Sequence, residues 1–349
     1  MLKHVILFRC DAGSVIGMGH FMRCLALAQC WRGLGGDAIF ILGELNQAVE
    51  EILEREGFSS DVFNGNIGTV EDALFTIQSV DLHGAQWLIV DGYQFKKKWF
   101  KTLKHCKAKI ALWTDYVQDK DLKLDLVINQ NPHAKVSDCK AISREARCLA
   151  GLKYVVLREE FRERIKLRSR RDGHATRLLL TMGGADPDDI TSQLLDILAE
   201  VPELEKVVLV VGANNRNASK LKEHANACKK IDFYDSVERM SAVMDSVDVA
   251  IAGAGITLWE LAFMGVPTFA VILAENQVPL SEAVEEMKIG FNLGWGHELQ
   301  ESEVLAKLNC CMSTPERLSE MSQNGMRSID GLGAERICKI LSGSIIKTK

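Results

Sequence analysis

The chain alternates short apolar segments with longer stretches of helical periodicity, and this pattern constrains its fold more than any other feature. Segments that are apolar along their whole length are typical of strands buried on both faces of a sheet. Strands that alternate with helices form parallel, doubly wound sheets. The alternation begins again at Thr176, so the sequence predicts an α/β protein with two Rossmann-like halves. The expected strands are 4–8, 38–42, 87–91, 110–114 and 124–128 in the first half and 177–182, 206–211, 247–252 and 268–273 in the second.

The 349 residues are enough for two domains of ordinary size. We expect an N-terminal domain at 1–150, a charged connector at 151–175 and a C-terminal domain with a helical tail at 176–349. The sequence leaves open whether the tail, 303–344, crosses back onto the first domain. Within the connector, residues 158–171 are rich in Arg and Glu, as in an exposed helix with ion pairs. Two such halves that face a central cleft would bind a ligand at the carboxyl ends of their strands.

Composition excludes several classes of protein. The formal net charge of −5 gives no electrostatic support to a nucleic-acid partner. No apolar run reaches the roughly 18 residues of a membrane span, and the residues before the first strand are too few for a signal peptide. The ten cysteines lack the paired CxxC spacing of a zinc site. We therefore expect a cytoplasmic protein with reduced thiols, no metal and no cofactor.

A glycine-rich turn follows the first expected strand and leads into the first expected helix. Gly17 and Gly19 let the backbone approach a ligand closely, and the free N–H groups at a helix start favour an anion. His20 stands directly after the second of these glycines. Because histidine titrates near neutral pH, His20 is a candidate general base.

Two polar side chains near this turn are candidates to assist His20. Arg23 lies three residues further along the helix, on the same face, where it could hold an anion or orient a carboxylate. Asp11 follows the first strand and could accept a hydrogen bond from the imidazole or from a substrate. The alternative is a capped helix with a surface histidine, since glycine-rich turns are weak evidence by themselves.

The second half contains a turn in which Gly183 and Gly184 separate an expected strand from an expected helix. The paired glycines allow a ligand to approach the backbone. Asp186 fits the N-cap of the helix and Pro187 fits its first position, so a purely structural role explains the turn equally well.

A further turn of the second half occupies residues 253–260. The backbone N–H groups of Gly255 and Ile256 and the hydroxyl of Thr257 could hold a diphosphate. Glu260 lies one helical turn later and could accept both hydroxyls of a ribose, or could be a solvated helix residue. The turn lacks the third glycine of a dinucleotide fingerprint, which disfavours NAD and FAD.

Other polar side chains also follow expected strands. Asn276 and Gln277 carry donors and acceptors that suit sugar or base edges, although a polar loop that caps the next helix would look the same. Smaller candidates at strand ends are Asp91, Tyr93, Asn129 and Asn131, and a weaker one is His133.

Taken in order, these motifs resemble the signature of the PseG/SpsG family of UDP-sugar hydrolases. The similarity is most specific in the first turn and covers most of residues 3–295. It rests on Arg9, Asp11, the turn 16–20, residues 22–24, 91–93, 129–131, 151–154, 157–161, 182–184 and 276–277.

The resemblance implies a GT-B fold, in which a nucleotide sugar lies between two Rossmann-like domains. It implies hydrolysis of UDP-2,4-diacetamido-2,4,6-trideoxy-β-L-altropyranose to the free sugar and UDP, in pseudaminic acid or related surface-glycan biosynthesis. It also implies that His20 activates water. The turn 253–260 resembles the nucleotide site of MurG-like glycosyltransferases. The residues predicted to bind the UDP-sugar are Asp11, Gly17, Gly19, Arg23, Tyr93, Asn129, Gly183, Gly184, Gly255, Ile256, Thr257, Glu260, Asn276 and Gln277.

Two departures from the family pattern leave the exact sugar open. Gly92 stands where a bulkier residue such as histidine can stand in relatives, and the chain is longer, with an added helical tail. One alternative function is a glycosyltransferase that uses an acceptor hydroxyl in place of water. Another is a nucleotide-sugar-binding protein without turnover. The sequence leaves the oligomeric state open.

Overall fold

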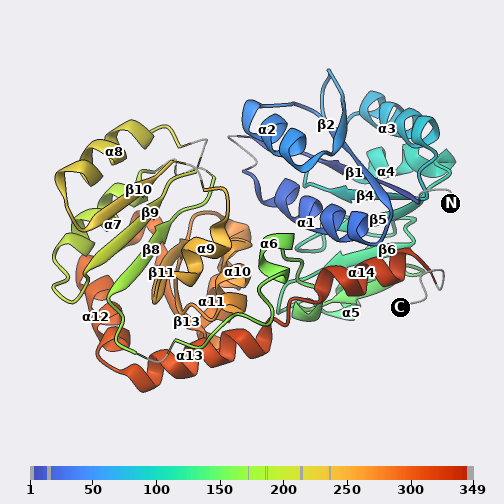
Figure 1. The fold of residues 1–349 in the computed structure, drawn as a ribbon. Helices are drawn as coiled ribbons and strands as arrows, with labels where there is room; N and C mark the ends of the chain where they lie inside the picture. The colour runs from blue at the N-terminus through green and yellow to red at the C-terminus, as the bar shows by residue number, and fades with distance from the viewer. Residues whose placement is uncertain are drawn as a thin grey trace. The chain divides into compact units, whose positions relative to one another are not determined.

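The structure is a computed structural model that describes residues 4–13, 17–171, 173–184, 186, 188–212, 215–235 and 237–343. The chain divides into two compact units (Figure 1). The first unit comprises residues 1–159 and 332–349, and the second comprises residues 160–331. Each unit is built on one parallel β-sheet.

The first unit contains a seven-stranded sheet among its described residues. The strands are β1 (Val5–Cys10), β2 (Asp37–Leu42), β3 (Ser59–Val62), β4 (Trp87–Asp91), β5 (Lys109–Trp113), β6 (Leu126–Asn129) and β7 (Arg147–Ala150). They lie in the order β3-β2-β1-β4-β5-β6-β7, and all neighbours are parallel. This order is doubly wound, and a doubly wound sheet was expected from the alternation of strands and helices.

Helices cover both faces of this sheet. They are α1 (Gly19–Gly33), α2 (Gln47–Glu56), α3 (Val70–His83), α4 (Lys97–Thr102), η1 (Leu103–His105), α5 (Val136–Ile142), η2 (Leu152–Tyr154) and α14 (Gly333–Leu341), and α6 (Glu159–Arg162) leads into the second unit. Because side chains alternate along a strand, Ile6 and Phe8 of β1 pack with α1, α2 and α14, whereas Leu7 packs with α3, α4 and α5. The expected burial on both faces is therefore confirmed.

The second unit contains a six-stranded sheet among its described residues, in the order β10-β9-β8-β11-β12-β13 with parallel neighbours. Its strands are β8 (Arg177–Thr181), β9 (Lys206–Val210), β10 (Ile231–Tyr234), β11 (Val249–Gly253), β12 (Thr268–Ile272) and β13 (Gly290–Trp295). Its helices are α7 (Ile190–Ala199), α8 (Ala218–Ala227), α9 (Met240–Asp245), α10 (Thr257–Met264), η3 (Glu275–Gln277), α11 (Val278–Glu286), η4 (Gly296–Glu298), α12 (Glu301–Met312) and α13 (Pro315–Ser328). None of the described helices has the length and apolar character that a membrane span needs.

The C-terminal helix α14 belongs to the first unit, and not to the second as the expected range 176–349 has it. Helix α14, at the red end of the chain in Figure 1, packs on α1. The indole Nε1 of Trp87 donates to the carbonyl of Leu341 at 2.8 Å. A Cβ on Gly333 would lie 2.0 Å from the carbonyl oxygen of Val155, so close packing here requires glycine. Helical periodicity predicts the helix but not the sheet that it covers.

The charged segment 158–171 is not one exposed helix. Helical structure is limited to α6, and the segment then continues in turns along the second unit. Arg168 donates to the carbonyl oxygens of Phe263 and Ile329, at 3.0 and 2.9 Å. These bonds satisfy carbonyl groups at the ends of α10 and α13, so this arginine has a structural role.

One pair of cysteines contradicts the expectation of reduced thiols. Cys139 in α5 and Cys148 in β7 form a disulfide, with their Cα atoms 5.7 Å apart. The two residues are nine apart in sequence and meet because α5 packs against β7. The spacing alone matches no disulfide or zinc motif, so the sequence does not single out this pair.

Candidate active site

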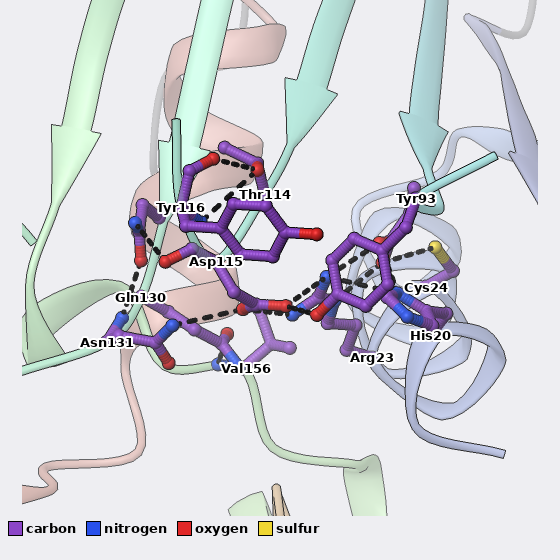
Figure 2. A network of polar contacts seen from close by, with 12 residues as sticks. His20, Arg23, Cys24, Tyr93, Thr114, Asp115, Tyr116, Gln130, Asn131 and Val156 are labelled. Atoms are coloured by element: carbon purple, nitrogen blue, oxygen red, sulfur yellow. Dashed lines mark hydrogen bonds and ion pairs between the residues drawn. The ribbon is translucent and has the colours of Figure 1, made fainter. Parts of the chain in front are cut away.

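Polar side chains at the carboxyl ends of β4, β5 and β6 meet side chains from the start of α1 (Figure 2). Helix α1 supplies His20 and Arg23, Asp91 is the last residue of β4, and Asp115 follows β5. Parallel strands end at one edge of the sheet, and the helix after β1 starts at that edge. The topology therefore gathers residues that are far apart in the sequence.

Asp91 is the hydrogen-bond partner of the His20 imidazole. Its side chain is fully buried, and its Oδ1 lies 2.6 Å from Nδ1 of His20. A carboxylate only accepts hydrogen bonds, so Nδ1 of the neutral imidazole is the donor. This tautomer leaves a lone pair on Nε2, which has no hydrogen-bond partner in the part of the chain that the structure describes. The arrangement suits a general base.

The alternative of a surface histidine on a capped helix does not hold. The side chain of His20 is only 10% exposed. Helix α1 has no side-chain cap at its N-terminus. The backbone N–H groups of Gly19, His20 and Phe21 have no acceptor among the described residues. The start of α1 therefore keeps donors for an anionic or polar ligand.

Arg23 forms ion pairs with two carboxylates. Its Nε lies 2.5 Å from Oδ2 of Asp91, and its Nη1 lies 2.9 Å from Oδ1 of Asp115. Burial by itself would raise the pKa of both carboxyl groups, but the guanidinium charge outweighs it, so the pKa of Asp91 and the pKa of Asp115 are both lowered. Both side chains are ionised at neutral pH. Of the two roles expected for Arg23, the structure shows the orientation of carboxylates.

Asp115, which no sequence motif indicates, connects several predicted site residues. Its Oδ2 accepts a hydrogen bond from the hydroxyl of Tyr93 at 2.5 Å, and its Oδ1 accepts one from Nδ2 of Asn131 at 3.1 Å. Its main-chain carbonyl accepts one from Nδ2 of Asn129 at 3.1 Å. The available signal was its position directly after an expected strand, close to the strand end where Asp91 lies in β4.

We expect Asp115→Asn to reduce the dependence of stability on acid pH. A carboxyl group with a lowered pKa stabilises the fold above its unfolded-state value of about 4, and this contribution is lost as pH falls through the folded-state pKa. Free energies of urea unfolding between pH 6 and pH 2.5 should therefore fall less steeply in the variant. Asp81→Asn, which changes a 43% exposed carboxylate on α3, is the control. Identical slopes in wild type and Asp115→Asn would contradict the assignment.

Asp11 contacts other groups than those expected. The imidazole of His20 bonds to Asp91, so the prediction that Asp11 accepts from the imidazole is wrong. Its Oδ1 accepts from Nη1 of buried Arg9 at 2.8 Å, and its Oδ2 accepts from Nε2 of Gln94 at 2.5 Å. These bonds stabilise the loops around β1. A direct contact of Asp11 with a substrate stays a prediction.

The glycine-rich turn is closed by its own backbone. Gly17 has a φ of 76°, which favours glycine, and its N–H donates to the carbonyl of Gly13 at 2.8 Å. Gly19 is the first residue of α1. Residues 14–16 of the motif, including Ile16, lie outside the described residues.

In the second unit, the start of α10 presents unused backbone donors. The helix follows β11, and its N-cap residue Ile256 makes no side-chain cap. The N–H groups of Ile256 and Thr257 have no acceptor among the described residues. Glu260 is only 7% exposed, so the alternative of a solvated helix residue is wrong. A helix start with free donors can hold a phosphate.

The turn after β8 brings two stretches of backbone together. Gly183 has a φ of 83°, and Gly184 follows it. A Cβ on Gly212 would lie 2.2 Å from the carbonyl oxygen of Gly183. Glycine is therefore required where the loops after β8 and β9 meet.

Asp186 is not the N-cap residue of α7, although its side chain does bind the helix start. The N-cap position belongs to Asp189. The carboxylate of Asp186 accepts from the N–H groups of Ile190 and Thr191, at 3.0 and 2.8 Å. These bonds support the alternative that Asp186 has a purely structural role at the start of the helix. Pro187 lies outside the described residues.

Asn276 and Gln277 lie in η3, directly after β12. Oε1 of Gln277 accepts from the N–H of Leu273 at 2.9 Å and so closes the end of the strand. Gln277 is the N-cap residue of α11 and makes no side-chain cap there. The predicted site residues thus fall into two groups, one around His20 in the first unit and one around the start of α10 in the second.

The second group lies in a region that matches a known family model. Residues 178–337 match the model of the glycosyltransferase family 28 C-terminal domain. That range contains the turns after β8, β11 and β12. The residues predicted to bind a nucleotide therefore lie within a region that is similar to glycosyltransferase domains.

Sequence relatives are similar to most of the chain. A UDP-2,4-diacetamido-2,4,6-trideoxy-β-L-altropyranose hydrolase of Campylobacter jejuni is 25% identical over 275 residues, 78% of this chain and 93% of that protein. The spore coat polysaccharide biosynthesis protein SpsG of Bacillus subtilis is 24% identical over 345 residues, 97% of both chains. An uncharacterized protein of Methanocaldococcus jannaschii is 25% identical over 275 residues, and the match spans 77% of this chain and only 55% of that relative's length.

Solved structures with a similar fold include MurG of Acinetobacter baumannii, with a TM-score of 0.66 and 13% identity over 97% of this chain and 99% of that chain. The calicheamicin glycosyltransferase CalG4 has a TM-score of 0.63 and 11% identity over 99% of this chain and 100% of that chain. At these identities the similarity concerns the fold alone. The chain has the GT-B type of fold, with one parallel α/β domain in each unit.

Proposed function

We propose that this protein hydrolyses UDP-2,4-diacetamido-2,4,6-trideoxy-β-L-altropyranose, or a closely related UDP-sugar, to the free sugar and UDP. The observation that carries this proposal is the contact of the His20 Nδ1 with buried Asp91, which leaves Nε2 as a proton acceptor. The similarity of the chain to a hydrolase of this substrate in Campylobacter jejuni supports it.

The proposed reaction is a single displacement. Water attacks the anomeric carbon while Nε2 of His20 takes one of its protons. The bond between the anomeric carbon and the diphosphate oxygen breaks, and UDP departs with the electron pair. Asp91 stabilises the imidazolium that forms. A positioned base contributes about 10²–10⁴-fold to the rate, and direct attack by water inverts the anomeric configuration.

The second unit supplies the groups that would hold the leaving group. We assign the N–H groups of Ile256 and Thr257 to the diphosphate, whose charge increases as the bond breaks. We assign Glu260 to the ribose hydroxyls. Since UDP is a good leaving group once its charge is stabilised, the reaction needs no strong general acid.

A glycosyltransferase reaction is the second candidate. The match of residues 178–337 to a glycosyltransferase domain favours it, as does the fold shared with MurG. The same nucleotide-binding groups would serve, and His20 would activate an acceptor hydroxyl in place of water. The two functions differ in whether UDP is released without an acceptor.

The decisive experiment measures UDP release from a panel of UDP-sugars without acceptor. We expect release from the diacetamido-trideoxy sugar, and a loss of about 10²–10⁴-fold in His20→Ala. His133→Ala, which removes an exposed histidine from the same unit, is the matched control. Nuclear magnetic resonance of the first product should show the inverted anomer.

Other outcomes would reject the proposal in distinct ways. UDP release only after an acceptor is added would identify a transferase. A retained anomeric configuration would exclude the single displacement. Tight binding without release, unchanged in His20→Ala, would identify a binding protein.

A further inference from the structure

Tyr116 presents an aromatic ring at the rim of the network around His20, and no step above uses it. The residue is 46% exposed. Its ring stacks on that of Tyr93, with centroids 5.3 Å apart and planes at 30° (Figure 2). The ring of Tyr93 in turn meets the imidazole of His20 nearly at right angles, with centroids 4.8 Å apart. Three rings thus follow one another outward from the candidate base, and the outermost is exposed.

The backbone around Tyr116 is fixed by hydrogen bonds. The hydroxyl of buried Thr114 donates to the carbonyl of Tyr116 at 2.7 Å and accepts from its N–H at 3.4 Å. The carbonyl of Asp115 accepts from Nδ2 of Asn129. An isolated exposed aromatic residue needs no explanation. A ring held in place beside a candidate base, however, is ready to contact a ligand without further ordering.

The hydroxyl of Tyr93 fixes the inner ring of the pair. It donates to Asp115, whose carboxylate is itself held by Arg23 and Asn131. Nε2 of Gln118 donates to the main-chain carbonyl of Tyr93 at 2.6 Å. The inner ring therefore has a defined orientation and supports the outer one. The exposed ring of Tyr116 offers apolar surface next to a network that is otherwise polar and charged.

We propose that Tyr93 and Tyr116 form a stacking platform for the sugar of the substrate, and that this platform selects sugars with an apolar face. The inference rests on the proposed function, because it assumes that the anomeric carbon is attacked next to His20. A 6-deoxy sugar carries a methyl group where an ordinary hexose carries a hydroxymethyl group, and its acetamido groups add two further methyl groups. Such C–H groups bind well on aromatic faces, where apolar surface is removed from water.

The test compares Tyr116→Ala and Tyr116→Phe with the wild type. With the diacetamido-trideoxy UDP-sugar, Tyr116→Ala should raise KM by about 3–10-fold with little change in kcat. Tyr116→Phe, which keeps the ring, should restore the wild-type KM. The Kd of UDP, measured by calorimetry, should be equal in all three proteins because UDP lacks the sugar. Leu82→Ala on α3 removes a 77% exposed apolar side chain and is the control.

The results that would overturn the platform differ from those that would overturn the proposed function. An unchanged KM in Tyr116→Ala would overturn the platform, as would a parallel rise in the Kd of UDP. If the wild type releases no UDP, the proposed function fails, and the platform is tested by binding alone. If Tyr116→Ala then weakens the binding of the UDP-sugar more than the binding of UDP, the platform is supported. If it weakens both equally, the platform is overturned.

Discussion

Asp91→Asn is expected to lower the rate of UDP release by about 10²–10⁴-fold, close to the effect of removing the base itself. The carboxylate of Asp91 accepts from Nδ1 of His20 at 2.6 Å and so keeps Nε2 unprotonated. An asparagine side chain can instead donate to Nδ1 through its amide. The imidazole would then carry its proton on Nε2, where it can no longer accept one from water.

Measurements of kcat and of UDP affinity separate this effect from a loss of folding. The Kd of UDP is expected to stay at the wild-type value, because the groups assigned to the nucleotide lie in the second unit. Circular dichroism and the urea midpoint report whether the first unit remains folded. A folded Asp91→Asn protein with a rate within threefold of wild type would refute the tautomer argument.

The interior strands were predictable and the edge strands were not. All nine expected strands are present, and interior strands such as β4, β11 and β12 are buried along their whole length. The four strands that the prediction missed are the two outermost strands of each sheet. Edge strands are covered on fewer sides, so they tolerate polar residues, charges and glycine and lack a continuous apolar run. Their sequences are SSDV in β3, RCLA in β7, IDFY in β10 and GFNLGW in β13.

For the candidate site, several residues were predictable from the sequence, but their contacts were not. Glycine turns and polar residues at strand ends identified His20, Arg23 and Tyr93 without any knowledge of their contacts. Asp11, which follows the first strand, was the candidate acceptor for His20 or for a substrate, whereas the structure pairs His20 with Asp91. The order of strands in the sheet decides this pairing, because β4 lies next to β1. Sequence proximity carries no information about strand order.

Asp115 illustrates the same limit. It has no motif of its own and follows one of several expected strands. Its importance depends on four contacts, which come from α1, from the loop after β4 and from the end of β6. A residue that organises a site through several contacts can be recognised only once the structure shows which residues it contacts.

Arg23→Leu is expected to lower the free energy of unfolding by about 3–5 kcal/mol, because it leaves two buried carboxylates without a cation. Asp91 is fully buried and the side chain of Asp115 is 13% exposed, so water cannot replace the guanidinium. Such a loss is a large fraction of the roughly 5–15 kcal/mol that stabilises a typical domain. Urea unfolding at pH 7 measures it. Arg32→Leu is the matched control, since its ion pair with Glu56 involves a 40% exposed guanidinium and should contribute at most about 1 kcal/mol.

A second variant distinguishes unpaired charge from lost packing. Arg23→Leu combined with Asp91→Asn and Asp115→Asn removes both carboxylate charges together with the arginine. If the uncompensated charges cause the instability, the triple variant should be more stable than Arg23→Leu alone, although it has lost more of the native hydrogen bonds. If the triple variant is instead less stable by the sum of the separate effects, the network stabilises the fold through its geometry and not through charge balance. The expected recovery would show that Arg23 stabilises the fold by balancing the charges of the two carboxylates beside the candidate base.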